Sequence, residues 1–471
     1  MMTYSWNLIG EVLGEGGEDQ SGQNVAFNSN GDRIITSAPY HIVQGEKKGH
    51  ARVVQQGEEG EWAMVSSDID GIGIGDRVWS VAMNEDGDRI AVGAPYNDIG
   101  GSNAGQVRIF RESNGAWVLV GEAIFGSAVW DLSGMSIDMD GNGTRVIIGS
   151  PSHTNEAGSK AGQARIYDEV DGSWVQVGNS LEGSSANDEF GTSVSISTDG
   201  KHIIVGSPYN DDNGTDSGHV KIYKEVNGSW VQIGADIQGE SPNDWAGYSV
   251  DISSSGQRVV IGSPYNSNME SGGFYSGQVR VYEQFDGSWM QIGQSINGEK
   301  PDDWSGYSVA MSSNGQRVVI GAPYNHDNGY HSGHARVFEE VDNVWIRLGQ
   351  DLDGNSYEGS GASVDINSDG TRILVGAPEN TSDNYSGAGH VRVYELGVLS
   401  SSPMPWWGYF SIFTALLIVL SGLFFFWKKR NGSGGGSKMN MNGSPVKFPI
   451  PVRAPDADKD IETKLSSSDS K

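Results

Sequence analysis

Short runs of alternating apolar and small or polar residues recur along the first 396 positions of the chain. In one unit, GYSVDIS from Gly247 is followed by the turn SSGQ and by RVVIGSP, and a long polar loop then leads to GQVRVYE from Gly277. A fourth run begins at Trp289, after the segment FDGSW. A period of two residues is typical of β-strands, and Asp-Gly or Asn-Gly between apolar runs is a strong hairpin signal. Each unit therefore predicts four short antiparallel strands.

The unit repeats about every 56 residues, a period in the range of propeller blades. One marker is the tryptophan that opens the fourth run, at Trp6, Trp62, Trp117, Trp174, Trp230, Trp289 and Trp345. A second marker, of the type GAPYN or GSPYN, recurs seven times in step with it. Four antiparallel strands per unit suit a propeller blade better than a solenoid coil. The count predicts seven blades.

The two ends of the repeat array predict how the ring closes. The chain opens with a lone fourth strand at Trp6, and the array finishes with a third strand, HVRVYE, from His390 to Glu395. We expect the first strand to complete the last blade, because this pairing hides open sheet edges. The sequence thus predicts an all-β fold, a seven-bladed propeller over residues 1–396 that the N-terminal strand closes. Short turns should share one face and long loops the other.

A membrane segment is predicted beyond the propeller. Residues 406–427, WWGYFSIFTALLIVLSGLFFFW, carry no charge and have aromatic residues at both borders, which indicates one transmembrane helix. Residues 397–405 form a juxtamembrane linker. The basic residues KKR follow the segment directly, so the positive-inside rule places the tail, 428–471, in the cytoplasm and the propeller in an extracellular or lumenal space. The tail has the composition of a disordered linker and contains FPIPVRAP, a candidate ligand for a cytoplasmic adaptor.

Residues 1–20 lack the basic and apolar character of a signal peptide, although Trp6 already belongs to a blade. We expect an incomplete N-terminus in preference to a propeller that faces the cytosol. If the propeller is exported, N-x-S/T sequons provide candidate glycosylation sites at Asn142, Asn213, Asn227, Asn380 and Asn384. Several of these coincide with turns, where Asn-Gly has a structural role of its own.

Composition narrows the set of partners. The net charge of −29 argues against nucleic acid, because phosphate binding requires a basic surface. Cations or basic surfaces fit better, although acidity also simply keeps a large domain soluble. The 68 glycines agree with many tight turns between short strands. With no cysteine, the chain forms no disulfide and offers no thiolate to a metal.

The units resemble FG-GAP repeats, the modules of the N-terminal propeller in integrin α subunits and related cell-surface proteins. The resemblance covers about residues 5–396 and rests on segments such as VGAPYN from Val92 and IGAPYN from Ile320. The FG half is literal only at Phe190 and Gly191. The resemblance implies an integrin-like propeller with a role in recognition or adhesion.

Such families often carry a calcium loop of the form DxDxDGxxD between the first two strands of a blade. The closest matches here are Asp138, Asp140 and Asn142 in one unit, and Asp365, Asn367 and Asp369 in another. The last Asp of the pattern is missing, because Val146 and Ile373 occupy its place. We therefore weigh Ca²⁺ at these turns against an ordinary hairpin turn, and predict no other cofactor.

Aromatic residues of the long loops, together with the tyrosines of the GAPY-type segments, could form a ligand-binding ring on the outward face. The loop aromatics are Trp130, Phe190, Trp245 and Trp304. Packing between blades is the alternative, because recurring residues usually serve the repeat itself. Less repeated loop residues are better candidates for specificity, namely Asp211, Asp212, His326, Asp327, Tyr330 and His331.

Catalysis is not predicted, because no nucleophile, acid–base set or phosphate-binding loop stands apart from the repeat. Four histidines, His50, His219, His334 and His390, open third strands where glutamine stands in other units, which indicates a structural hydrogen bond. The leading hypothesis is a membrane-anchored recognition or adhesion protein that binds an extracellular or lumenal protein or glycan. The alternatives are a non-catalytic scaffold at a membrane and an enzyme with a site at the propeller centre.

Overall fold

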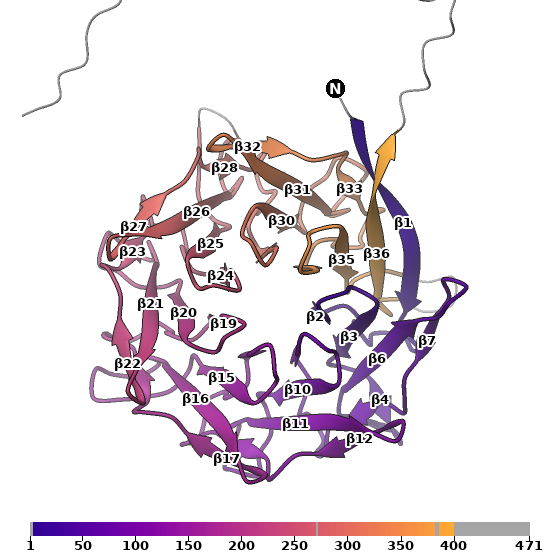
Figure 1. Ribbon diagram of the computed structural model, residues 1–471, viewed down its shortest axis with the longest axis vertical. Helices are drawn as coiled ribbons and strands as arrows, with labels where there is room; N and C mark the ends of the chain where they lie inside the picture. Colours follow the sequence, from indigo (N-terminus) through magenta and orange to yellow (C-terminus); the bar gives the residue numbers. More distant parts are fainter. Residues whose placement is uncertain (1–2, 270–271, 382–385, 400–471) are drawn as a thin grey trace, which may run out of the picture. The chain divides into compact units, whose positions relative to one another are not determined.

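The computed structural model describes residues 3–269, 272–381 and 386–399. Within them, seven antiparallel sheets are arranged around a central channel like the blades of a propeller (Figure 1). The innermost strands are β2 (Val25–Phe27), β9 (Ser80–Met83), β14 (Ser136–Met139), β19 (Ser193–Ile196), β24 (Ser249–Ile252), β29 (Ser308–Met311) and β34 (Ser363–Ile366). The second strands are β3 (Arg33–Ala38), β10 (Arg89–Ala94), β15 (Arg145–Ser150), β20 (His202–Ser207), β25 (Arg258–Ser263), β30 (Arg317–Ala322) and β35 (Arg372–Ala377). The prediction of seven blades is confirmed.

The outer half of each blade follows the same order. The third strands are β6 (His50–Gln56), β11 (Gln106–Ser113), β16 (Gln163–Val170), β21 (His219–Val226), β26 (Gln278–Phe285), β31 (His334–Val341) and β36 (His390–Leu399). The fourth strands are β7 (Trp62–Met64), β12 (Ala116–Leu119), β17 (Ser173–Gln176), β22 (Ser229–Gln232), β27 (Ser288–Gln291), β32 (Val344–Arg347) and β1 (Thr3–Leu13). Short fifth strands also pair with the third: β8 (Ile69–Asp70), β13 (Ile124–Phe125), β18 (Leu181–Glu182), β23 (Ile237–Gln238), β28 (Ile296–Asn297) and β33 (Leu352–Asp353). A separate hairpin joins β4 (Ile42–Val43) to β5 (Glu46–Lys47) in the first blade.

The apolar core lies between blades. Each of its seven clusters takes residues from two neighbouring blades; one, for example, joins Ile35 and Val53 of the first blade to Val81 and Ile90 of the second. Second strands are buried almost throughout because both of their faces are covered. Continuous apolar runs such as RVVIG are typical of strands in that position.

The first strand closes the ring as predicted. β1 pairs with β36 from Thr3 opposite Leu399 to Leu13 opposite His390, with a bulge between Leu8 and Gly10. The indole nitrogen of Trp6, which is buried, donates a hydrogen bond of 2.8 Å to the carbonyl oxygen of Leu348 in the sixth blade. Thus the first strand completes the seventh blade and also ties it to its neighbour.

A second closure runs around the channel through the turns that follow the innermost strands. In six of the seven junctions a backbone amide of one turn donates to a carbonyl oxygen of the next, and in the seventh the Thr198 hydroxyl lies 3.0 Å from that of Ser254. The residues of this circuit are Ser29, Glu85, Gly141, Thr198, Ser254, Ser313 and Ser368. The short turns therefore share one face, as the alternation of strand directions requires.

The membrane prediction falls outside this ring. Within the described residues, no helix combines the length and the apolar character that crossing a bilayer requires. The segment 406–427, the tail and Asn384 lie outside the described residues.

Candidate functional site

A row of aromatic rings in mutual contact crosses the long-loop face from the fourth blade to the seventh. The aromatic row consists of Tyr209, Trp245, Tyr265, Trp304, Tyr324, His331, Tyr330 and Tyr357. Loops before the innermost strands supply Trp245, Trp304 and Tyr357, and loops after the second strands supply the others. The row is thus built by two kinds of loop from adjacent blades.

Ring distances show that the row is continuous. The centroids of Trp245 and Tyr265 are 3.7 Å apart with an interplanar angle of 23°, a stacked arrangement. Tyr265 lies 4.5 Å from Trp304, and Trp304 lies 4.2 Å from Tyr324. Centroid separations of this size place aromatic pairs in favourable contact, each contributing about 0.5–1.5 kcal/mol beyond area burial. The two tryptophans are half-buried, so their rings serve packing and still present an edge to solvent.

The far end of the row is the most exposed. Tyr330 stacks on His331 at 4.0 Å and on His326 at 5.0 Å, and it also approaches Tyr357. Side-chain exposure rises here to 56% for Tyr330 and 61% for Tyr357. Exposed aromatic surface of this kind is typical of a binding site, because aromatic side chains supply large contact area at low conformational cost.

A buried acid in each blade fixes the loops that carry the row. Asp303 accepts hydrogen bonds from the Lys300 amide and from the side chain of Asn325, the residue that follows the GAPY tyrosine. The acid recurs as Asp19, Asp76, Asp131, Asp188, Asp244, Asp303 and Glu358. Our sequence reasoning missed it, although one acid per unit at this spacing was visible. The residue after it is Trp245 in the fifth blade and Trp304 in the sixth, both at positive φ.

The four predicted loop aromatics occupy three different positions. Trp245 and Trp304 are equivalent and lie in the row, whereas Trp130 is exposed and lies one residue before its buried acid. Phe190 is 0% exposed and packs in the core between the third and fourth blades, where Ala246 and Ser305 stand in other units. Phe190 therefore belongs to the packing of the fold, and the structure does not place it on the binding surface.

The predicted specificity residues fall into two groups. His326, Asp327, Tyr330 and His331 lie on one loop at the end of the aromatic row, where the His326 ring nitrogen accepts a hydrogen bond from the His331 amide at 2.9 Å. Asp327 forms an ion pair with Lys300. Asp211 and Asp212 lie in the fourth blade, where Asp211 accepts a bond from the Asp216 amide at 2.8 Å.

The central channel has a different character. Its cavity of about 460 Å³ is lined by the innermost strands of all seven blades. Asp138, Asp251 and Asp365 occupy one repeat position, in the third, fifth and seventh blades, and each accepts a hydrogen bond from a backbone amide of the next blade. Burial, reinforced by the neighbouring carboxylates, raises the pKa of Asp138 and of Asp365 to about 7. These acids link adjacent blades.

Ser195 lies between two of these acids. Its hydroxyl oxygen is 2.9 Å from a carboxyl oxygen of Asp138 and 2.9 Å from one of Asp251. A hydroxyl donates a single proton, so both contacts are hydrogen bonds only when one of the two carboxyl groups is protonated. Burial raises the pKa of Asp251 to about 6, in agreement with a shared proton at this point.

The remaining calcium candidates serve their own turns. Asp140 accepts hydrogen bonds from the amides of Thr144 and Arg145, and Asn367 accepts the equivalent pair from Thr371 and Arg372. The Asp369 carboxylate accepts bonds from the Thr371 amide and hydroxyl, and Asn142 is exposed. These contacts are those of a hairpin turn, and calcium at the two turns stays a prediction.

The sequons differ in accessibility. Asn142, Asn213 and Asn227 are exposed. Asn380 is buried, and its amide nitrogen donates a 2.8 Å hydrogen bond to Glu358, the acid of the seventh blade. Because a glycan is attached to that nitrogen, Asn380 is an unfavourable acceptor in this fold, which corrects the prediction from the sequon alone.

These features define a seven-bladed propeller whose long loops carry a continuous row of aromatic rings. Residues 182–223 and 297–338 match the FG-GAP repeat family, which agrees with the resemblance seen in the repeats. Comparison with curated protein sequences gives no significant match. Among solved structures, a chain described as Kuenenia stuttgartiensis hydrazine synthase is similar, with a TM-score of 0.50 and 14% identity over 83% of this chain and 97% of that chain. At this identity the likeness concerns the fold alone.

Proposed function

We propose that this protein is a membrane-anchored recognition or adhesion protein whose long-loop face binds a protein or glycan partner through the aromatic row. FG-GAP propellers suggest a role in binding, and the unbroken chain of aromatic contacts from Tyr209 to Tyr357 is the observation that carries the proposal. Propeller repeats need interblade packing in every blade, but the ring contacts of the row join only the fourth to the seventh. A local feature in a repeated fold favours a specific role.

The row combines anchors with a polar border. Trp245 and Trp304 each contact aromatic rings on both sides, which makes them rigid anchors that lose little freedom on binding. His326, Asp327 and Asp302 provide donors and acceptors beside them. An aromatic strip with polar neighbours fits a sugar ring or an extended peptide. No step of catalysis is part of the proposal.

Screening of the full-length protein in detergent against glycan and protein panels, followed by a double variant, tests this function. Tyr330→Ser with Tyr357→Ser removes the two most exposed rings of the row, and we expect binding of the identified partner to weaken at least tenfold, about 1.4 kcal/mol. The matched control is Phe285→Ser, because Phe285 is 71% exposed and ends a third strand, on the short-turn face. Unchanged binding in the double variant, with unchanged melting, would favour the scaffold alternative.

The membrane part of the proposal rests on residues 406–427 and the basic residues after them. β36 enters the short-turn face, and the linker that follows it is short. We propose that the propeller is extracellular or lumenal and the tail cytoplasmic, as the positive-inside rule predicts. In this orientation the row is accessible to a partner on another cell or in solution.

A further inference from the structure

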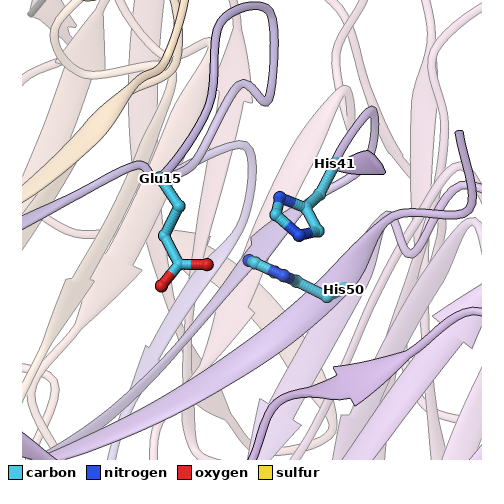
Figure 2. Close-up of side chains that lie close together, drawn as sticks. All are labelled: Glu15, His41 and His50. Atoms are coloured by element: carbon cyan, nitrogen blue, oxygen red, sulfur yellow. The ribbon is translucent and has the colours of Figure 1, made fainter. Parts of the chain in front are cut away.

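Three side chains of the first blade converge on one point outside the aromatic row. Glu15 lies in the loop after β1, His41 follows β3, and His50 opens β6. One ligand atom from each lies within 4.8 Å of the other two (Figure 2). Figure 2 shows the Glu15 carboxylate and the two imidazole rings facing a common space. The ring centroids of His41 and His50 are 4.0 Å apart.

One ring nitrogen of His50 is left without a hydrogen-bond partner in the described part of the chain, and the carboxylate of Asp68 lies 3.7 Å from it. His50 is 3% exposed, and its Nδ1 atom forms no hydrogen bond among the described residues. A buried nitrogen left without a hydrogen-bond partner is unfavourable, and a bound cation would supply the missing interaction.

His41 is oriented as metal-binding histidines commonly are. Its Nδ1 atom lies 2.9 Å from a carboxyl oxygen of Asp19, which is buried and held by the Gly16 amide. A carboxylate on one ring nitrogen fixes the tautomer and leaves the other nitrogen free as a ligand. Asp19 therefore supports the site without being one of its ligands.

The charges around the site favour a cation. Glu15, Asp19 and Asp68 bring three carboxylates, and Arg52 brings one guanidinium, paired with Asp68 at 3.0 Å and with Glu15 at 2.5 Å. The nearby Lys47 and Lys48 are paired with acids of their own. The excess of negative charge is left unneutralised, and a divalent ion would balance it.

We propose that Glu15, His41 and His50 bind a divalent transition-metal ion, with zinc as the best match. Two imidazole nitrogens and one carboxylate are ligands that zinc accepts, whereas calcium and magnesium prefer oxygen alone. Three protein ligands leave a fourth position for water or for a group of a partner. The site is distinct from the turns considered for calcium.

The repeat itself shows that this trio is not a packing requirement. The other six units carry Asn or His at the position of His41, and Gln or His at the position of His50, but both histidines occur together only in the first unit. In the second blade, for example, Asn97 and Gln106 take these places and Asn97 still binds its acid, Asp76. The same fold therefore forms without the ligand pair.

This exchange provides variants that should fold. His41→Asn keeps a donor for Asp19, and His50→Gln copies the second, third and fifth blades. Full-length protein, stripped with a chelator, is titrated with zinc at pH 7.5 by calorimetry, and with Co²⁺ by visible absorption. We expect each variant to bind zinc at this site at least tenfold more weakly than wild type. At concentrations that saturate wild type, each variant should therefore bind up to one equivalent less.

The control is His334→Gln, which removes an equally buried histidine of the sixth blade that has no second histidine beside it. It should bind zinc as wild type does. A second cluster could also bind zinc and add to the measured stoichiometry; it consists of Asp212, His219 and Asp236. Titration of His219→Gln shows how much of the bound zinc belongs to this cluster. If His41→Asn and His50→Gln retain the stoichiometry and affinity of wild type, the proposal is wrong.

Discussion

Two positions of the repeat vary together from blade to blade. Blades whose third strand opens with His carry an acidic residue directly before the fifth strand. In the seventh blade, β1 provides the equivalent position. The acids are Asp68, Asp236, Asp351 and Glu11, and units that open with Gln carry Ala123, Ser180 or Ser295 instead. At least one ring nitrogen of each of the four histidines lacks a hydrogen-bond partner among the described residues, and the predicted structural hydrogen bond stays a prediction. A nearby carboxylate is the feature they share.

These buried histidines predict an acid-sensitive fold. Burial, with a contribution from Arg336, lowers the pKa of His334 to about 3. The unfolded chain therefore binds a proton that the folded one does not, and stability is lost as pH falls below about 6.5. Between pH 7.5 and pH 5 the loss from His334 amounts to at most about 2 kcal/mol.

Urea denaturation of wild type and of His334→Gln at the two pH values measures this loss. Glutamine binds no proton, and Gln163 donates to Glu182 at the position equivalent to Asp353, so the variant has a partner available. We expect the stability difference between the two proteins to shift in favour of the variant by about 1–2 kcal/mol on acidification. A constant difference across the range would show that the buried ring is not a source of acid sensitivity.

At the scale of elements, the sequence was sufficient where a pattern recurs. Period-two alternation and the Asp-Gly turns located the four main strands of each blade, and the lone strand at Trp6 predicted the pairing with β36. The short fifth strands were missed because two residues are too few to show a period. Phe190 was assigned to the surface because it resembles the other loop aromatics. The residues at the equivalent position of other blades, such as Ala246 and Ser305, are small and buried.

The closing strand predicts a large and specific loss of stability. Trp6 is buried against the sixth and seventh blades and donates its indole hydrogen bond to Leu348. Trp6→Ala should lower the free energy of unfolding by about 3 kcal/mol, as expected for a large aromatic residue removed from a core. Trp117→Ala is the matched control, because Trp117 is only half-buried in its blade. Chemical denaturation monitored by circular dichroism measures the free energy of unfolding of both variants. Equal decreases in the two would show that the closing strand does not contribute more to stability than an ordinary fourth strand.

At the scale of the whole molecule, the ring explains why binding residues were harder to predict than strands. The row joins residues as far apart in sequence as Tyr209 and Tyr357, and only the circular order of blades brings them side by side. Glu15 and His50 also come from separate segments, the loop after β1 and the start of β6. A site whose residues come from segments far apart in the sequence has no contiguous sequence motif by which it could be recognised.

The proposed orientation at a membrane gives the last prediction. If the propeller is extracellular or lumenal, glycans should be attached to sequons whose amide is accessible and absent where the fold buries it. Asn142 and Asn227 are exposed in turns, whereas Asn380 donates its amide to Glu358. Glycopeptide mapping by mass spectrometry, on protein isolated from its own cells, should find glycans at the first two and none at Asn380. Because N-glycosylation takes place in the secretory pathway, a propeller without any glycan at these exposed asparagines would support a cytosolic orientation, and the aromatic row would then meet cytosolic partners.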